Sequence, residues 1–322
     1  MEHSLKSTID NTTWNADPSK PYYTQFLSNG KAYVRRRFVP WPLARISSVN
    51  TIQRASFDSY IHRRDAAGQG ITIYVLDTGI DGKRTNIQSR ILPGVSFVGG
   101  EPNEDHHGHG TSITSVLVDP WLGVAPAAKV VSVRVAKDDG MTDETSIIQG
   151  LQWVHSHAKP GKSIVNISLT SAKSVYLDAA VLAMYKANIP VFTAAGNFYT
   201  NACHYSPASS PGAFTVAASD INDRLMDFSN WGECVDIIAP GYHAPTAWSN
   251  GRWNLVSGTS VATAYVSGVA ALFLSDPELN ITKVDDLYKM LQVSASTYSV
   301  NLNGQPNTTQ SILYNQPYGS AP

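Results

Sequence analysis

The chain has 322 residues, of which 43% are hydrophobic, and its formal net charge is −1. These values are compatible with one large α/β domain or two small ones. Positive and negative residues are interspersed, which argues against a nucleic-acid-binding protein and a membrane-surface protein, and the longest apolar run, residues 261–274, is too short to span a bilayer.

The first 38 residues are polar and end in the basic cluster Arg35, Arg36 and Arg37. We interpret them as an extended or loosely attached arm. Such a cluster is usually a solvated surface, and the alternative is a processing site. Residues 1–20 lack the apolar core of a secretory signal. A folded domain is expected over residues 39–300, and residues 301–322 are expected to form an irregular tail.

A short run rich in β-branched residues, Ile71–Leu76, is followed by Asp77-Thr78-Gly79. This pattern predicts a buried strand with Asp77 at its carboxyl end. Further strands are expected over 130–135, 163–169, 191–195, 214–218 and 235–239, and helices near 113–118 and over 145–157, 175–188 and 284–292. Strands alternating with helices indicate a mainly parallel sheet with helices on both faces. Active sites of open α/β sheets lie at the carboxyl edge of the strands.

Residues 255–274 read LVSGTSVATAYVSGVAALFL, which contains no charged residue. The composition predicts a helix that is buried on all sides, with Ser260 near its start. Negative charge that develops near Ser260 would be stabilised there by free N–H groups and by the helix dipole. The alternative is a serine that only caps a core helix.

Four polar residues, Asp77, His109, Asn197 and Ser260, each lie at the end of a predicted strand or the start of a predicted helix. Serine needs a base to become a nucleophile near neutral pH. Histidine can be that base, and a buried carboxylate fixes its tautomer. The amide of Asn197 and the backbone N–H of Ser260 could hydrogen-bond a tetrahedral oxyanion. The set therefore suits acyl transfer.

The segments around these residues resemble the signature blocks of the subtilisin-like serine proteases. They are VLDTG at 75–79, HGHGT at 107–111, AAGN at 194–197 and SGTSVA at 257–262. The order Asp, His, Ser along the chain is also that of subtilisin. PWPLARISS at 40–48, YSPASSPGAFTVAASD at 205–220 and FSNWGECVDIIAPG at 228–241 resemble the proteinase K branch. The resemblance covers roughly residues 38–300.

The resemblance implies a subtilisin-like α/β fold of three layers, in which a mostly parallel, twisted sheet is flanked by helices. It implies a serine endopeptidase in which Asp77 orients the base, His109 is the general base and then acid, Ser260 is the nucleophile and Asn197 is an oxyanion donor. No cofactor is required for this chemistry. The implied partners are protein or peptide substrates of a monomer, without nucleic acid or membrane. The arm of residues 1–38 would be the remnant of a pro-region.

By the same resemblance, two extended segments, residues 139–142 and 168–170, hold the substrate backbone. The primary pocket lies between residues 168–170 and 194–196, which implies tolerance of apolar or aromatic side chains. The implied substrate-binding residues are Gly140, Met141, Thr142, Ser168, Leu169, Thr170, Ala194, Ala195 and Gly196.

The chain departs from the family pattern near the cleft. Ser112 stands where a histidine usually follows HGT, and the usual Pro-His of the nucleophile helix reads Ala-Tyr at 264–265. Thr170 and Ser171 replace glycines of the usual SLGG, and Met-Thr at 141–142 replaces small residues on the opposite wall. Because glycine lets a peptide backbone approach closely, these side chains are expected to narrow the cleft.

Two alternatives to a hydrolase stay open at this point. One is a catalytically weak subtilase scaffold used for binding. The other is a subtilase that acts as a peptide transferase or cyclase, since the chemistry up to the acyl-enzyme would be the same.

The contexts of Cys203 and Cys234, NACHYSPAS and GECVDIIAPG, resemble members of the proteinase K branch that carry a disulfide here. The alternative is a pair of buried thiols. A bridge favours an oxidising compartment, and the resemblance implies a secreted protein, whereas the missing signal in this chain argues the other way.

Two metal sites are considered. The first is a cluster of acidic residues and histidines whose spacing fits no common zinc pattern. Its members are Glu104, Asp105, His106, His107 and His109. The second is a structural Ca²⁺ implied by the resemblance, held by the carbonyls of Pro211 and Ala213 and the carboxylate of Asp236, because hard oxygen ligands suit calcium. The alternative is that Asp236 only makes hydrogen bonds at a strand start.

Overall fold

The computed structural model describes residues 10–14, 23–52, 59–83, 86–297 and 300–315. The helices are α1 (Trp41–Ile46), α2 (His109–Val118), α3 (Glu144–His157), α4 (Val175–Lys186), α5 (Thr259–Ser275) and α6 (Val284–Ser294), with 3-10 turns at Gln88–Arg90 and Ala202–His204. The strands are β1 (Asp10–Trp14), β2 (Tyr23–Ser28), β3 (Lys31–Arg37), β4 (Ser59–Arg63), β5 (Thr72–Asp77), β6 (Ile91–Ser96), β7 (Lys129–Arg134), β8 (Ser163–Ile167), β9 (Ser171–Ala172), β10 (Val191–Ala194), β11 (Tyr205–Ser206), β12 (Ala213–Ser219), β13 (Ile237–Pro240), β14 (Ala244–Ala247) and β15 (Trp253–Val256). Parts of the predicted arm (1–9 and 15–22) and tail (316–322) lie outside the described residues.

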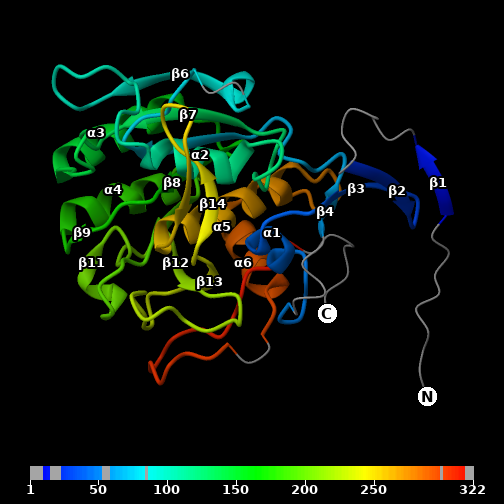
Figure 1. The fold of residues 1–322 in the computed structure, drawn as a ribbon. Helices are drawn as coiled ribbons and strands as arrows, with labels where there is room; N and C mark the ends of the chain where they lie inside the picture. The colour runs from blue at the N-terminus through cyan, green and yellow to red at the C-terminus, as the bar shows by residue number, and fades with distance from the viewer. Residues whose placement is uncertain (1–9, 15–22, 53–58, 84–85, 298–299, 316–322) are drawn as a thin grey trace.

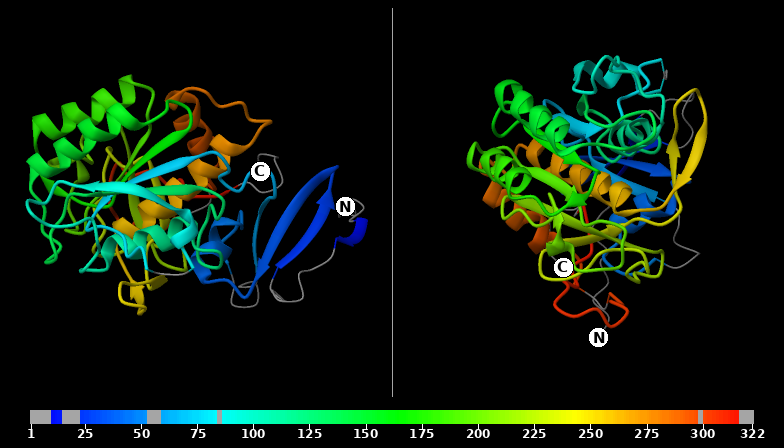
Figure 2. Two further views of the ribbon diagram at one scale, coloured as in Figure 1. Left: turned by 90° about the horizontal axis from the view of Figure 1, so that it is seen from above. Right: turned by 90° about the vertical axis from the view of Figure 1, so that its left-hand side faces the viewer.

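A seven-stranded sheet forms the centre of the molecule, in the order β13-β12-β10-β8-β5-β7-β6. All six strand pairs within it are parallel. Figures 1 and 2 show the strands running between helices on either side. This confirms the predicted α/β fold with a parallel sheet flanked by helices. Each strand predicted from the sequence occurs, with bounds that differ by at most two residues at either end.

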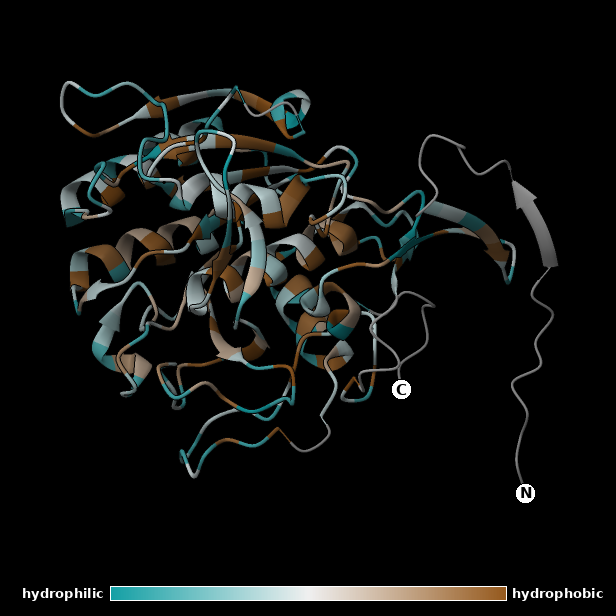
Figure 3. Cartoon of the chain, viewed as in Figure 1, coloured by the Kyte–Doolittle hydropathy of each residue, from teal (hydrophilic) through white to brown (hydrophobic). Residues whose placement is uncertain are grey.

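The side chains of β5 alternate between two hydrophobic layers. Ile73 and Val75 pack with α2 and α5 on one face of the sheet. Tyr74 and Leu76 pack with α3 and α4 on the other. A parallel strand covered on both faces must be apolar at every position, which explains the continuous run in the sequence. Figure 3 shows hydrophobic segments on the strands and helices in the middle of the molecule.

Helix α5 is buried from Val261 to Leu274, as the sequence predicts. It crosses under four strands of the sheet and also packs on α2. The close approach requires small residues: a Cβ on Gly268 would stand 2.5 Å from the Cβ of Val124. Among the described residues, no helix is long and apolar enough to cross a membrane.

Several elements of the main domain, including two features of its sheets, are absent from the sequence prediction. Strand β6 lies at the edge of the sheet and contains Pro93 and Gly94, and its pairing with β7 is irregular between Leu92 and Val95. Proline and an irregular register are tolerated at an edge but break the pattern by which a strand is recognised. The second feature is the hairpin of β14 and β15, which pairs residues 244–247 with 253–256.

The arm is attached more firmly than the sequence indicates. Strands β2 and β3 form a hairpin whose second strand pairs with β4, and β1 pairs with β2 (Figure 1, right). Arg36 is fully buried, so it is neither solvated nor accessible to a processing enzyme. Its guanidinium donates to the backbone oxygens of Pro120, Trp121 and Gly123. The described part of the arm is therefore a docked hairpin, not a loose extension.

The described part of the tail has no helix or extended strand, as predicted. It is nevertheless docked on the edge of the sheet, where Ile238 N–H donates to Ser311 O at 2.9 Å and Leu313 N–H donates to Ile238 O at 2.8 Å. Ile312 and Leu313 are fully buried.

Candidate active site

His109 begins α2 directly beyond the carboxyl end of β5, where Asp77 stands. Its Nδ1 lies 2.7 Å from Asp77 Oδ1. Asp77 is fully buried, and the same oxygen accepts a hydrogen bond from Thr78 N–H at 2.8 Å. Because an ionised carboxylate can only accept, Nδ1 carries the proton and Nε2 is left as the basic nitrogen.

The charges around His109 favour its protonated form. Burial lowers the pKa of His109, but the carboxylates of Asp77 and Asp105 raise it, and the net result is a pKa above the ordinary value. The side chain remains 19% exposed, so the ring can still reach a substrate. His109 is therefore a stronger base than a free imidazole.

Asp105 holds the turn that carries His109. It is 5% exposed, and its Oδ1 accepts from Thr78 Oγ1–H at 2.8 Å and from Gly108 N–H at 2.7 Å. Its Oδ2 accepts from the N–H of Thr111 at 2.8 Å and from its hydroxyl at 2.6 Å. The bonds from Gly108 and Thr111 fix the chain on both sides of His109, and the bond from Thr78 links this turn to the residue after Asp77. Sequence reasoning considered Asp105 only as part of a metal cluster and missed this positioning role.

No group of three or more His, Cys, Asp or Glu side chains suited to a metal ion occurs among the described residues, whose gaps are given above.

Gly108 precedes His109 with a φ of 111°, a conformation that side chains other than glycine rarely adopt. A Cβ there would also stand 2.1 Å from Nε1 of Trp248. The entry to α2 therefore requires glycine.

Ser260 is the second residue of α5, so its backbone lies in the first turn of the helix. Its Oγ–H donates to Ser168 O at 2.9 Å, while Ser168 Oγ–H donates back to Ser260 O at 2.9 Å. The hydrogen bonds of the described residues include none between Ser260 and His109. The Ser260 hydroxyl is thus directed at the Ser168 carbonyl, and hydrogen bonds of catalytic groups are often long or poorly aligned without substrate.

Asn197 lies on the exposed loop after β10 and is tied to the start of α5. Its Oδ1 accepts from Thr259 N–H at 2.9 Å and from Thr259 Oγ1–H at 3.0 Å. These two donors identify the oxygen, so the opposite side of the amide presents Nδ2–H. This Nδ2 lies 3.2 Å from the place where a Cβ on Gly258 would stand. The donor is thus held beside the backbone that leads into Ser260.

The loop of Asn197 is braced by Asn230, which sequence reasoning missed. Asn230 is fully buried. Its Nδ2–H donates to Ala195 O at 2.8 Å, and its Oδ1 accepts from Phe198 N–H at 2.9 Å and from Thr200 N–H at 3.2 Å. The only sequence signal is that Asn230 is a polar residue within FSNWGECVDIIAPG at 228–241. No local pattern in the sequence links it to Asn197.

The two predicted substrate walls differ in conformation. Residues 168–170 follow β8 without regular structure, and Asn166 steadies them by donating from Nδ2 to Ser168 Oγ at 3.0 Å. Of residues 139–142, predicted to be extended, Asp139 and Gly140 belong to a tight turn, in which Gly140 N–H donates to Lys137 O at 2.9 Å and Lys137 N–H donates to Met141 O at 2.8 Å. Thr142 pairs antiparallel with Ala136 across this turn. The carbonyl of Met141 is therefore already occupied. Met141 itself is 66% exposed.

Ala194 is the last residue of β10, Ala195 and Gly196 follow it, and both alanines are buried.

A cavity of about 1100 Å³ is lined in part by Asp105, but its lining contains none of the four predicted catalytic side chains.

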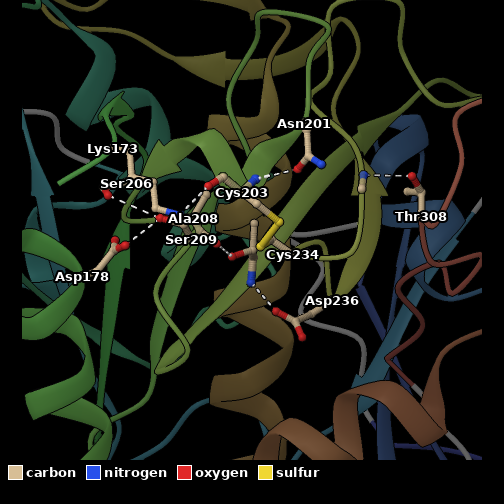
Figure 4. The surroundings of a disulfide bond; sticks show 12 residues. Lys173, Asp178, Asn201, Cys203, Ser206, Ala208, Ser209, Cys234, Asp236 and Thr308 are labelled. Atoms are coloured by element: carbon tan, nitrogen blue, oxygen red, sulfur yellow. Dashed lines mark hydrogen bonds between the residues drawn. A yellow bond between two sulfur atoms is a disulfide. The ribbon is translucent and has the colours of Figure 1, made fainter. Parts of the chain in front are cut away.

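Cys203 and Cys234 form a disulfide, with their Cα atoms 5.4 Å apart. Figure 4 shows Asp236 below this bond, with its carboxylate turned toward the backbone of β12. Asp236 Oδ2 accepts from Thr215 N–H at 2.7 Å. Burial raises the pKa of Asp236 to about 6, against a smaller lowering by this hydrogen bond. No ion pair joins Asp236 to a described residue.

Asp236 is half-buried and has no cationic partner among the described residues, so a cation bound there would offset the cost of burying part of its charge. The carboxylate of Asp236 is therefore a candidate calcium ligand, and a single carboxylate would leave most of the coordination to carbonyls and water.

Residues 68–318 match the family model described as the subtilase family. A putative subtilase-type proteinase of the sexual differentiation process from Schizosaccharomyces pombe is 37% identical over 82% of the chain. An alkaline serine exoprotease A from Vibrio alginolyticus is 39% identical over 65%. The crystal structure of a cold-adapted subtilisin-like serine proteinase superposes with a TM-score of 0.78 at 33% identity, covering 86% of this chain and 98% of that one.

The chain spans only part of the curated relatives, 59% of the Schizosaccharomyces pombe protein and 39% of the Vibrio alginolyticus protein. The matched residues 68–318 nevertheless include the predicted catalytic residues from Asp77 to Ser260. On the fold, the site and these similarities together, the chain belongs to the subtilase family.

Proposed function

We propose that this chain is a serine endopeptidase that hydrolyses peptide bonds through an acyl-enzyme. Nε2 of His109 takes the proton of Ser260 Oγ as this oxygen attacks the scissile carbonyl carbon. The carbonyl oxygen becomes an oxyanion, which accepts hydrogen bonds from Asn197 Nδ2–H and Ser260 N–H. The imidazolium then gives its proton to the leaving amine. Water attacks the acyl-enzyme with His109 again as the base, which releases the acid and restores Ser260.

The observation that carries the proposal is the 2.7 Å hydrogen bond between His109 Nδ1 and the buried Asp77. It leaves Nε2 unprotonated and raises the pKa of the ring, as a general base requires. The tie between Asn197 and Thr259 supports the oxyanion role, because it sets an amide donor beside the nucleophile before any charge develops.

Labelling with a fluorophosphonate probe tests the proposal, because such probes react with activated serines. The native chain should be labelled and Ser260→Ala should not. Ser257→Ala, which removes an exposed hydroxyl three residues earlier, should be labelled like the native chain. If the folded native chain is not labelled, the active-enzyme reading is wrong and the scaffold alternative replaces it.

The transferase alternative predicts a different product, not a different labelling. Incubating an acyl-donor peptide with an added amine nucleophile separates the two: a hydrolase gives mainly the free acid, whereas a transferase gives mainly the new amide. A product mixture dominated by the amide at low nucleophile concentration would overturn the hydrolase proposal.

We infer a structural calcium ion held by Asp236 with the carbonyls of Pro211 and Ala213. When bound, the ion would supply charge neutralisation at Asp236, which lies near the disulfide (Figure 4). Ca²⁺ at about 100 times its dissociation constant should stabilise the fold by about 2.7 kcal/mol. The unfolding temperature should therefore be higher in Ca²⁺ than in EDTA, and Asp236→Asn should abolish the difference. Equal values for the native chain would exclude the site.

The disulfide supports an oxidising compartment, so we infer that the protein works outside the reducing cytosol, on protein or peptide substrates. Quantifying the oxidised fraction of Cys203 and Cys234 in protein from its native source tests this inference, and fully reduced cysteines would contradict it.

A further inference from the structure

The side chain of Thr170 extends from the segment 168–170 to the segment 194–196, which are the two predicted walls of the primary pocket. Its methyl carbon Cγ2 stands 3.2 Å from the place where a Cβ on Gly196 would be, so it lies against the backbone of Gly196. Residues 168–170 and 194–196 are therefore in contact through this methyl group.

The geometry of the nucleophile indicates what would otherwise lie between these two segments. Ser260 Oγ is 2.9 Å from Ser168 O, and Gly196 directly precedes Asn197, the proposed oxyanion donor. A scissile carbonyl must place its carbon at Ser260 Oγ and its oxygen near Asn197. The α-carbon attached to that carbonyl is one bond away. By the resemblance, its side chain is expected between residues 168–170 and 194–196, the two segments that the Thr170 methyl joins.

Neither wall is free to move back. Gly196 N–H donates to Thr259 Oγ1 at 3.1 Å and Gly196 O accepts from Asn230 N–H at 2.9 Å, which ties this wall to the buried start of α5. Beyond Thr170 the chain pairs with β11, where Ser171 is opposite Ser206. Threonine is also branched at Cβ, so its χ1 has few alternatives.

We propose that Thr170 fills the primary side-chain pocket and restricts cleavage to bonds that follow glycine, alanine or serine. The inference rests on the proposed hydrolase function and names its substrate class. It replaces the expectation of apolar or aromatic side chains at this position. The discrimination is steric: large aliphatic and aromatic side chains collide with the Thr170 methyl and with the Gly196 backbone behind it.

The test uses the full chain and a series of tetrapeptide p-nitroanilides that differ only in the last residue, which is Gly, Ala, Leu or Phe. One excluded methylene is worth about 10–200-fold in kcat/KM. The native chain should therefore cleave after Ala at least about 100-fold better than after Phe. Thr170→Gly should raise kcat/KM for Phe by at least about 10-fold, and it should raise the Phe-to-Ala ratio of kcat/KM by a similar factor.

Three controls make the result decisive. Thr282→Gly makes the same chemical change at an exposed site away from the cleft and should leave the Ala-to-Phe ratio unchanged. Thr170→Ser removes only the methyl group and serves if the glycine variant does not fold. Active-site titration with a small-alkyl fluorophosphonate counts working enzyme in each sample.

The outcomes separate this inference from the proposed function. A chain that is not labelled refutes the hydrolase proposal, and this inference with it. A labelled chain that cleaves after Phe as well as after Ala refutes the pocket inference alone. So does a Thr170→Gly or Thr170→Ser variant in which the Ala-to-Phe ratio is unchanged.

Discussion

Replacing Asp105 by asparagine should weaken both the fold and the catalytic base. The carboxylate accepts four hydrogen bonds of 2.6–2.8 Å from Thr78, Gly108 and Thr111. An asparagine has one accepting oxygen, and its NH₂ group must face either Gly108 N–H or Thr111 N–H. The hydroxyl of Thr111 can turn to accept, but a backbone N–H cannot. One buried donor is left unsatisfied in either orientation, which costs about 1–3 kcal/mol.

The same substitution removes a negative charge that raises the pKa of His109. His109 acts as a base only when neutral, so kcat/KM falls as the pH drops through its pKa. Without the Asp105 carboxylate the pKa decreases and protonation begins at a lower pH. The acidic limb of the pH profile should therefore move to lower pH in Asp105→Asn.

Two measurements check the argument: thermal unfolding, and kcat/KM against pH for a peptide substrate. Asp286→Asn, at an exposed position of α6, is the matched control and should change stability by less than about 0.5 kcal/mol. An unfolding free energy equal to that of the native chain would show that the four hydrogen bonds are not needed. An acidic limb that stays in place, or moves to higher pH, would refute the electrostatic part.

Three further substitutions have expected outcomes of their own. Asn197→Ala should lower kcat about 10²–10³-fold with little change in KM, because the amide donor acts on charge that develops in the transition state. Steady-state kinetics measures this effect, and a loss of kcat below about 3-fold would contradict the oxyanion role. Replacing Cys203 and Cys234 together by serine opens a loop of 31 residues and should lower the free energy of unfolding by about 3–4 kcal/mol. Denaturant titration measures this change, and an unchanged midpoint of the unfolding transition would show that the disulfide adds no stability. Arg36→Met should lower the free energy of unfolding by roughly 1–3 kcal/mol, since it removes the donor to three backbone oxygens. Arg37→Met, at the exposed neighbouring position, should leave this free energy unchanged. Equal effects of the two substitutions would count against a specific role for the buried guanidinium.

The sequence predicts those parts of the site whose signals are local. Asp77 ends an apolar run that predicts a buried strand, and Ser260 begins a run that predicts a buried helix, and both elements occur. Parallel strands bring their carboxyl ends to one edge of the sheet, which is why residues separated by 183 positions (260 − 77) could be expected together.

The groups that position those residues were not predictable in the same way. Asn230 braces the Asn197 loop from 33 positions further along the chain (230 − 197), and its neighbours in sequence give no sign of it. Asp105 lies among other acidic residues and histidines, so a buried acceptor of four hydrogen bonds looks like one member of a charged cluster. The turn at Asp139 and Gly140 depends on backbone bonds that composition does not encode. Side chains that act through the backbone of others leave little pattern in a single sequence.

The docked hairpin shows how such a residue can act on the catalytic helix from outside the predicted domain. Helix α2 begins at His109, and the chain continues from its last turn through Asp119 into residues 120–123. Arg36 places a buried positive charge on the oxygens of Pro120 and Trp121, at the end of the helix where the dipole is negative. Asp105 secures the other end of the same helix. Helix α2 is therefore flanked at both ends by buried charged side chains, Asp105 from the main domain and Arg36 from the arm.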